Sequence, residues 1–362
     1  MEVALAWLFG HVSHRVPTGR APSFTHPLPI LTRRQSSVPR GTLACPLPPP
    51  SHTSPPAVIG HQVDAWAQHS AHFVVNARGQ RIFVQSWRPF PAKRRRWWPW
   101  GKRDTQPKGV VYIVHGLNDH SNKYVRVARA WVDAGYVVVA HDFHGHGRSD
   151  GYRAYTSSMQ HYVDDAKHAM ADADRRLPGR FARLPKFLLA HSLGGAVAIH
   201  LARDAEPGAF RGVMLTAPAV KVYPKPLLKL FAPVIGTLAP LLPVQKLKFD
   251  RRRRRRKREG EYVSHEDPLV VRSPVRARVG YEVLKSCEKI MSEAEKFKVP
   301  VFVAHSREDR VTNARGTIDF HDRIASCDKT VRLYDGRVHD LLAEKRDMVM
   351  ADMVSWASRR LR

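Results

Sequence analysis

The sequence predicts an α/β protein, with a mostly parallel central sheet flanked by helices and a cap inserted into it. Three observations carry this prediction. From residue 110 onward, short apolar runs alternate with helical stretches, as in a parallel sheet covered on both faces. The alternation stops at about residue 219 and resumes at about residue 299. Hydrophobic residues make up 43% of the 362-residue chain, which is normal for a protein with a substantial core.

The elements follow one another in a regular order. A hairpin leads into the sheet, because "AHFVVNARGQRIFVQSW", from residue 71, holds two strand-like runs around an Asn-Ala-Arg-Gly turn. Before the cap, the alternation predicts strands at 110–116, 136–143, 186–192 and 212–218, and helices at 122–134, 159–177 and 193–205. After the cap it predicts strands at 299–306 and 329–335, and helices at 314–326 and from 343. Apolar residues at helical spacing predict a cap helix near 281–297.

The same patterns divide the chain into four parts. Residues 1–60 hold eleven of the 27 prolines and a single acidic residue, so we expect them to be disordered. Residues 61–218 and 299–362 are expected to form the two parts of the core, and residues 219–298 the cap.

The composition of residues 1–60, rich in Arg and Ser and poor in acids, is typical of an organelle transit peptide. We therefore expect delivery to a chloroplast or another organelle. A plain disordered extension, or a wrongly chosen start codon, is the alternative, and the protein would then be cytoplasmic and peripheral to a membrane. No apolar run reaches the ~18 residues that a membrane span needs.

The formal net charge of +28 is concentrated in short segments. Six basic residues lie in "KRRRWWPWGKR" (93–103) and eight in "RRRRRRKR" (251–258). Because the charge is local, a nucleic-acid-binding surface is not indicated. The tryptophan-containing run, and the arginine run within the cap, favour contact with an anionic membrane surface. A solvated insertion, or an error in the gene model, is the alternative for 251–258.

The stretch "AHSLGG" (190–195) follows a buried strand and precedes a helix, and it raises the question of whether Ser192 is a nucleophile. A serine on such a sharp turn needs small residues two positions before and after it, because strand and helix pack closely there. Ala190 and Gly194 meet that need. The context favours a nucleophilic serine over an ordinary one.

A serine hydroxyl becomes a good nucleophile when a histidine accepts its proton and an acid orients that histidine. Asp309 follows the strand 299–306, and His339 follows the strand 329–335, so both lie at carboxyl ends of strands, as Ser192 does. Glu308 is a rival for the acid, and Asp340 is interpreted as a helix-start or surface residue. The backbone N–H groups of Leu193 and Leu117 are the expected oxyanion donors.

Together, these residues resemble the monoacylglycerol lipase branch of the α/β-hydrolases, and the plant lysophospholipase-like and caffeoylshikimate esterase-like members above all. The similarity spans roughly residues 70–360, and is carried by "VHGLNDHSNKY", "HDFHGHGRSDGYRAY", "AHSLGGAVA", "HSREDRVT", "YDGRVHDLL" and the cap segments "GVMLTAPAVKVYPKP" and "DPLVVRSPVRARVGYEVL". The resemblance implies Ser192 as nucleophile, Asp309 as acid and His339 as base, with Leu117 and Leu193 as oxyanion donors.

This chain departs from the family pattern at three places. Ala190 stands where glycine is usual, Asn118-Asp119 where Gly-Glu is usual, and Ser306 replaces a common glycine. None of these changes removes a catalytic group.

Two stretches admit a second interpretation. The histidines of "HDFHGHG" (141–147) suggest a metal site, but a glycine-rich loop shaped by Asp142 and Asp150 is favoured, so no metal is expected. The apolar stretch 222–244 is broken by prolines and two lysines, which argues against a membrane span. It is expected to be a buried cap helix, or a lid that lines an acyl pocket and touches lipid.

The sequence therefore predicts a serine hydrolase that cleaves monoacylglycerol or a related lysolipid through an acyl-enzyme. Acyl transfer by such a triad needs water and no cofactor. A caffeoylshikimate-type or general carboxylesterase is the second hypothesis. A receptor that uses the hydrolase fold without turnover is the third, and an intact Ser-Asp-His set argues against it. The sequence carries no indication of an oligomeric state.

Overall fold

The computed structural model describes residues 66–90, 106–181, 183–223, 226–245 and 267–361, all of which belong to one unit of the chain. The predicted extension 1–60 and the arginine run 251–258 lie outside these residues, as does the tryptophan-containing run 93–103. The disorder, transit and membrane-contact predictions for them therefore stay predictions, as does the division of the chain into four parts.

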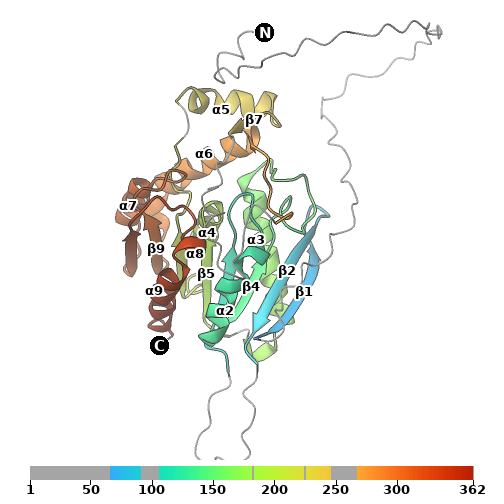
Figure 1. Ribbon diagram of the computed structural model, residues 1–362, viewed down its shortest axis with the longest axis vertical. Coiled ribbons are helices and arrows are strands. Elements are labelled where there is room, and N and C mark those ends of the chain that lie inside the picture. Colours follow the sequence, from blue (N-terminus) through green and yellow to red (C-terminus); the bar gives the residue numbers. More distant parts are fainter. Residues whose placement is uncertain (1–65, 91–105, 182, 224–225, 246–266, 362) are drawn as a thin grey trace, which may run out of the picture. The chain divides into compact units, whose positions relative to one another are not determined.

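An eight-stranded sheet with the order β1-β2-β4-β3-β5-β6-β9-β10 forms the centre of the molecule (Figure 1). Its strands are β1 (Gln68–Val75), β2 (Arg81–Arg88), β3 (Val110–Val114), β4 (Val137–His141), β5 (Lys186–His191), β6 (Gly212–Thr216), β9 (Val301–Ser306) and β10 (Lys329–Tyr334). The hairpin β1–β2 and the pair β2–β4 are antiparallel, and all other pairs are parallel. The predicted fold is confirmed.

Helices cover both faces of the sheet. They are η1 (Ser121–Tyr124), α2 (Val125–Asp133), α3 (Met159–Arg176), η2 (Gly179–Phe181), α4 (Leu193–Arg203), α7 (Ala314–Arg323), α8 (Leu341–Glu344) and α9 (Arg346–Ser358). One hydrophobic cluster joins α3, α4 and α7 to the sheet, and a second joins α2, α8 and α9 to its other face. Every residue of β3, β4, β6 and β9 is buried, which explains why these strands read as continuous apolar runs.

Helices α4 and α7 end two and three residues earlier than expected, and three other predicted helices differ more. The helix expected at 122–134 begins as the 3-10 turn η1, and α2 starts only at Val125. The single helix expected from 343 is divided at Lys345, whose backbone (φ −126°, ψ 28°) separates α8 from α9. The cap helix expected near 281–297 is α6 (Ala277–Ser292), followed by the 3-10 turn η4 (Ala294–Lys296). These shifts lie at helix ends, where the apolar period carries the least information.

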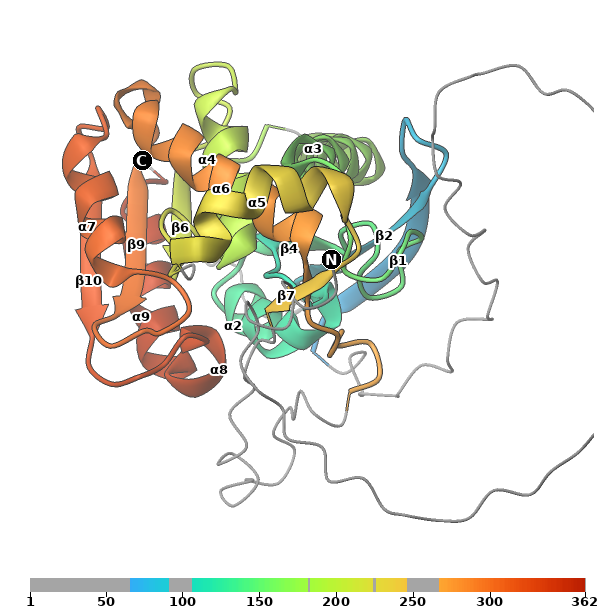
Figure 2. The ribbon, with the colours of Figure 1, turned by 90° about the horizontal axis from the view of Figure 1, so that it is seen from above.

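The segment predicted as a cap contains α5 (Pro226–Leu238) and α6, which pack against each other over the sheet (Figures 1 and 2). It also contains a two-stranded antiparallel sheet, β7 (Pro243–Gln245) and β8 (Val275–Arg276), which was not predicted. Strands of two or three residues are too short to show an alternating pattern. Among the described residues, no helix has the length and apolar character needed to cross a membrane.

Polar contacts fix the cap helix α6 to the core. The carboxylate of Glu282 accepts a hydrogen bond from the N–H of Met159 at the start of α3, at 3.1 Å. Further along α6, the hydroxyl of Ser286 lies 2.9 Å from Nε2 of His200 on α4. By contrast, Leu230 and Leu238 of α5 are 71% and 80% exposed, so α5 is not the buried cap helix that one of the two interpretations expected.

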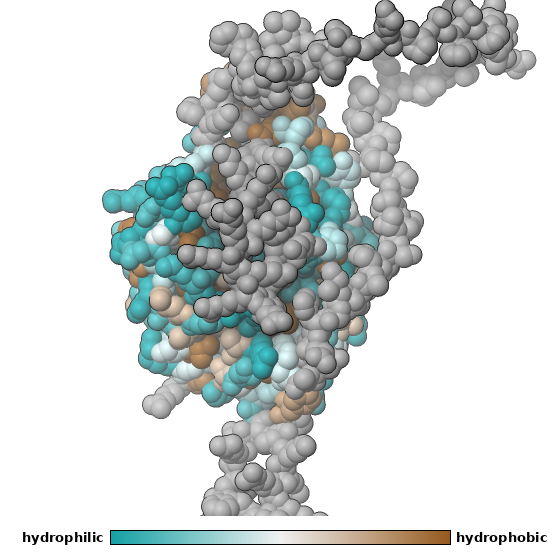
Figure 3. Space-filling view, viewed as in Figure 1, coloured by the Kyte–Doolittle hydropathy of each residue, from teal (hydrophilic) through white to brown (hydrophobic). Residues whose placement is uncertain are grey.

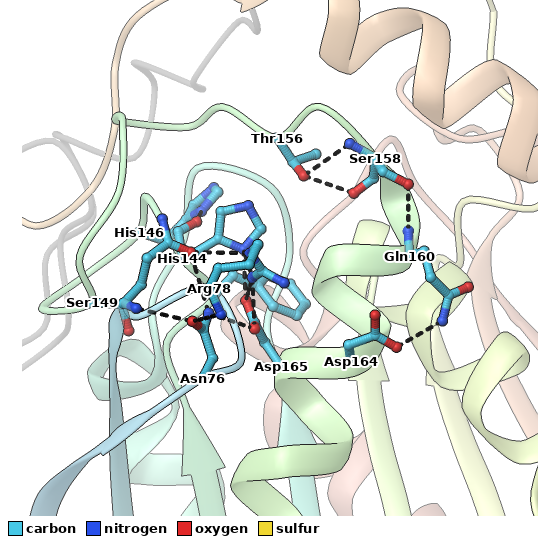
Figure 4. A network of polar contacts seen from close by, with 12 residues as sticks. Asn76, Arg78, His144, His146, Ser149, Thr156, Ser158, Gln160, Asp164 and Asp165 are labelled. Carbon is cyan, nitrogen blue, oxygen red and sulfur yellow. Dashed lines mark hydrogen bonds and ion pairs between the residues drawn. The ribbon is translucent and has the colours of Figure 1, made fainter. Parts of the chain in front are cut away.

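The glycine-rich loop after β4 is held by a buried carboxylate. Asp165 on α3 accepts hydrogen bonds from Arg78 at 2.6 Å and Asn76 at 2.8 Å, and its Oδ2 lies 2.7 Å from Nδ1 of His144 (Figure 4). This network joins the hairpin turn, the loop and α3, and so fixes the loop close to the carboxyl edge of the sheet.

Candidate active site

Ser192 occupies a strained turn between β5 and α4. Its backbone angles, φ 54° and ψ −117°, lie in a region that non-glycine residues rarely adopt. The turn is fixed by hydrogen bonds from the Ser192 N–H to the carbonyl of Thr216 (3.0 Å) and from the Gly195 N–H to the carbonyl of Ser192 (2.9 Å). The predicted strand-to-helix turn is therefore present, with the serine at its tip.

The two small residues around Ser192 have different importance. A Cβ at Gly194 would lie 2.3 Å from the carbonyl oxygen of Val114 and 2.4 Å from that of His115, because the first turn of α4 rests directly on the end of β3. Ala190, in contrast, is a fully buried residue of β5 whose methyl group belongs to the core. The departure from the family pattern at Ala190 is thus compatible with the turn, whereas position 194 requires glycine.

Ser192, His339 and Asp309 form one hydrogen-bonded chain. Nε2 of His339 lies 2.9 Å from Oγ of Ser192, and its Nδ1 lies 2.7 Å from Oδ2 of Asp309. The serine follows β5, Asp309 follows β9, and His339 follows β10, so three loops at the carboxyl edge of the sheet supply one residue each. The structure thus brings together the three residues that the sequence singles out.

Asp309 is buried, but its carboxylate is well provided with hydrogen-bond donors. Its Oδ1 accepts the N–H of Val311 (2.7 Å), and its Oδ2 accepts the hydroxyl of Thr312 (2.9 Å) and lies 3.1 Å from Nε2 of His305. Burial alone would raise its pKa, but the hydrogen bonds with His305 and His339 outweigh burial and hold the pKa well below its usual range. Asp309 is therefore ionised at neutral pH.

Thr312 and His305 are parts of the site that the sequence does not single out. Thr312 touches both Asp309 and the ring of His339, whose Nδ1 lies 3.4 Å from its hydroxyl. The rival acid Glu308 points elsewhere: its half-exposed side chain forms an ion pair with Arg337 at 2.8 Å. The acid that meets the histidine is therefore Asp309.

Ser306, a second departure from the family pattern, connects two loops of the site. Its hydroxyl donates to the carbonyl of Gly336 and accepts the N–H of Val338 at 3.3 Å. It therefore joins the loop that carries Asp309 to the loop that carries His339, a contact that glycine would not make.

The predicted oxyanion donors lie on opposite sides of Ser192 in the chain. The loop after β3 forms a tight turn, with the Asp119 N–H donating to the carbonyl of Gly116 at 3.2 Å, and Leu117 lies inside it. A Cβ at Gly116 would lie 3.4 Å from Cβ of Ser192, so this turn touches the serine. None of the hydrogen bonds found among the described residues is donated by the N–H of Leu117 or Leu193. Leu193 follows Ser192 directly, and Leu117 lies in the turn that touches it.

Besides His305, a second buried histidine, His191, contacts the triad. The ring of His191 lies 4.9 Å from that of His339, centroid to centroid. Burial lowers the pKa of His191 to about 3, so this ring is neutral at pH 7 and adds no charge to the site.

The three histidines of residues 141–147 do not converge on one point. His144 pairs with Asp165, and Nδ1 of His146 lies 3.1 Å from the carbonyl of His144. Asp142, as expected, shapes the loop by accepting the N–H groups of Ser121 and Arg148. Within the described part of the chain, no group of three or more His, Cys, Asp or Glu side chains is arranged to hold a metal ion.

A mostly parallel eight-stranded sheet, a strained serine after β5, and an acid and a histidine after β9 and β10 define an α/β-hydrolase. Residues 105–346 match the family described as "Serine aminopeptidase, S33", and the chain belongs to this family of hydrolases.

Similar proteins include lipases and esterases. The chain is 30% identical to human monoglyceride lipase over 293 residues, covering 79% of this chain and 90% of the human protein. It is 28% identical to caffeoylshikimate esterase from Arabidopsis thaliana, covering 78% and 83% of the two chains. Among solved structures, monoacylglycerol lipase from Paleococcus ferrophilus superimposes with a TM-score of 0.59 at 29% identity, covering 70% of this chain and 96% of that one. The family resemblance read from the sequence is confirmed.

Proposed function

We propose that the protein is a serine carboxylic-ester hydrolase that cleaves monoacylglycerol or a related lysolipid through an acyl-enzyme on Ser192. The observation that carries this proposal is the continuous chain of short contacts from Oγ of Ser192 through His339 to the ionised Asp309. The relatives named monoglyceride lipase and monoacylglycerol lipase support the substrate class.

In this mechanism, Nε2 of His339 accepts the hydroxyl proton of Ser192 while Oγ attacks the ester carbonyl carbon. The N–H groups of Leu117 and Leu193 stabilise the negative charge that develops on the carbonyl oxygen. His339 then gives the proton to the leaving alcohol. Water, activated by the same histidine, releases the fatty acid, and Asp309 stabilises the imidazolium in both halves of the reaction.

A lipid substrate also accounts for the exposed side of α5. Leu230, Val234 and Leu238, spaced four residues apart, are 71%, 55% and 80% exposed, and we call this row the lid face. Figure 3 shows hydrophobic surface at the end of the molecule that carries α5. An apolar helix face of this kind is suited to contact lipid acyl chains. We propose that the lid face, together with the two basic runs, docks on anionic membranes.

Docking is tested by replacing the three lid-face residues with serine and measuring sedimentation with anionic vesicles. We expect weaker binding and unchanged hydrolysis of a soluble short-chain ester. The matched control replaces Val75 and Met348, which are 57% and 60% exposed elsewhere, and should bind like the wild type. Neutralising Arg251 to Arg256 should lower binding most at low salt. The docking proposal would be contradicted if the lid-face variant and the arginine variant both bound the vesicles as well as the wild type does.

A caffeoylshikimate-type or general carboxylesterase is the alternative function, and the Arabidopsis relative is the observation in its favour. Parallel assays on monoacylglycerols, lysophospholipids and caffeoylshikimate decide between the two. We expect kcat/KM to be highest for a monoacylglycerol. A higher kcat/KM for caffeoylshikimate would contradict the proposed lipid substrate but not the proposed triad.

We propose organelle import for residues 1–60, on the strength of their composition alone. A fluorescent reporter fused behind these residues should enter chloroplasts or another organelle, while the protein lacking them should keep its esterase activity. A reporter that stays in the cytoplasm would favour the plain extension.

A further inference from the structure

A nearly buried lysine joins the loop after β3 to the loop that carries His339. Nζ of Lys123 lies 2.6 Å from Oδ2 of Asp119 and 2.8 Å from Oδ2 of Asp340, and the three side chains are only 12%, 10% and 23% exposed. None of these residues takes part in the acyl-transfer steps described above. We call the three side chains the ionic latch.

We propose that the ionic latch positions His339 relative to the oxyanion turn and that its charges govern the pH dependence of catalysis. The proposal rests on the proposed function, in which His339 is the general base.

Each end of the latch is attached to a part of the site. Asp340 follows His339 directly, and its second oxygen, Oδ1, accepts the N–H of Ala343 at 3.0 Å, so both carboxylate oxygens are held. At the other end, the N–H of Asp119 closes the turn that contains Leu117. The lysine therefore fixes the distance between the loop of the base and the loop of one oxyanion donor.

The latch also supplies charge next to the imidazole. The groups that face His339 are Ser192, Asp309, Thr312 and the neutral ring of His191, all within contact distance, and the latch carboxylate that follows it in the chain. A carboxylate beside an imidazole stabilises the positive charge that proton transfer places on the ring, and a lysine opposes it.

All charges of the pair Lys123–Asp340 are present at neutral pH. Burial would lower the pKa of Lys123, but Asp119 and Asp340 raise it above its usual range. Burial would likewise raise the pKa of Asp340, but Lys123 holds it below its usual range. A buried ion pair of this kind contributes little net stability, because desolvation offsets the attraction. A role in positioning the base accounts for its place in the site better than stability does.

Two variants separate charge from structure. Asp340→Asn removes the negative charge yet keeps a side-chain oxygen for the helix start, since Asn caps helices as well as Asp does. Lys123→Met removes the positive charge and keeps the apolar stem. The readout is the acid limb of the pH profile of kcat/KM, because this limb reports protonation of the free enzyme. We expect it to move to lower pH in Asp340→Asn and to higher pH in Lys123→Met, by on the order of half to one pH unit.

Two further variants serve as controls. Lys123→Arg keeps the positive charge, and the acid limb of its kcat/KM profile should lie at the same pH as in the wild type. Asp133→Asn removes a carboxylate from the exposed ion pair with Arg129, 3.7 Å apart at the end of α2, and should leave the pH profile unchanged. Thermal unfolding of each variant shows whether it is folded. Should Lys123→Met fail to fold, the shift in Asp340→Asn alone decides.

The pH dependence is measured in two independent ways, as the rate of modification of Ser192 by a fluorophosphonate and as the NMR titration of the His339 ring. Opposite shifts in the two variants support the latch. Lower rates with an unmoved acid limb and an unmoved His339 titration would overturn it, leaving a purely structural ion pair. A wild-type protein whose Ser192 resists the fluorophosphonate would instead refute the proposed function, and the NMR titration would still test the latch.

Discussion

At the scale of the residue, Asp309 and its neighbour Glu308 show how position decides chemistry. The two carboxylates are adjacent in the chain, but Asp309 is buried against His305 and His339, whereas Glu308 faces solvent beside Arg337. Only the first contacts Nδ1 of His339, and in the proposed mechanism this contact holds the imidazole in the tautomer that accepts the serine proton through Nε2.

Asp309→Asn is accordingly expected to lower kcat for ester hydrolysis by on the order of 10³-fold or more, because the amide favours the wrong tautomer. Glu308→Gln, its matched control, should stay within about twofold of wild type, since an exposed ion pair contributes little. Steady-state kinetics on a soluble ester measure both. The assignment of the acid would be reversed by a large loss in Glu308→Gln and a small one in Asp309→Asn.

The residues that the sequence does and does not indicate differ in a physical way. Ser192, Asp309 and His339 can be predicted because each follows a strand and together they match a known order. Thr312 and Lys123 cannot, because their roles depend on contacts with residues 27 and 217 positions away in the chain. A threonine in a loop and a lysine in a first helical turn have no sequence pattern that separates them from ordinary surface residues.

At the scale of the element, the approach of α4 to β3 determines the backbone geometry at Ser192. The carbonyl oxygens at the end of β3 lie where a side chain at Gly194 would be, so the helix can start at Ser192 only with glycine there. The turn that contains Leu117 follows directly after these carbonyl groups, so the packing of Gly194 against them also holds this turn beside Ser192.

Gly194→Ala should therefore destabilise the fold by about 1–3 kcal/mol and lower kcat, because a rigid carbonyl cannot move away from the new methyl group. The matched control is Gly280→Ala on α6, where the nearest atom would lie 3.7 Å away, an ordinary contact. Alanine there should stabilise the helix by up to about 1 kcal/mol. Urea unfolding and kinetics are the measurements. Equal stability of the two variants would contradict this account of the turn.

A helix or strand could be predicted from the sequence where burial of one face, or of the whole strand, produces a regular pattern of apolar residues. The fully buried strands are continuous apolar runs. In the amphipathic helices α3 and α6, buried residues recur every three to four positions. No such pattern of apolar residues marks the pair β7–β8, whose position is set by packing within the cap. The same holds for the break at Lys345, whose position is set by packing around the loop of His339.

At the scale of the whole molecule, the interior holds many neutral histidines. Burial lowers the pKa of His141 and His200 to about 4 and that of His191 to about 3, and it lowers the pKa of His115 and His146 well below the usual value. In the unfolded chain these groups bind protons near pH 6.5. Below that pH, the unfolded state therefore binds more protons than the folded state.

The folded state therefore becomes more stable as the pH rises toward about 6.5, and this stability is lost as the pH falls below that value. Each such histidine costs about 1.4 kcal/mol per pH unit until its folded pKa is reached. We expect the free energy of unfolding, measured in urea, to fall by several kcal/mol between pH 6.5 and 4.5. In His200→Gln, whose side chain contacts Ser286 of α6 in the wild type, the difference in bound protons between the unfolded and folded states should fall by about one. A flat profile over this range would show that the histidines are not buried as neutral groups.

The central claim, that Ser192 and His339 act as one catalytic unit on a lipid ester, is tested most directly by kinetics of Ser192→Ala, His339→Ala and the double variant on a monoacylglycerol. Members of a triad depend on one another, so each single change should lower kcat by on the order of 10⁴-fold or more, and the double change should be little worse than either. A Ser192→Ala protein that keeps a substantial fraction of wild-type turnover would contradict the claim.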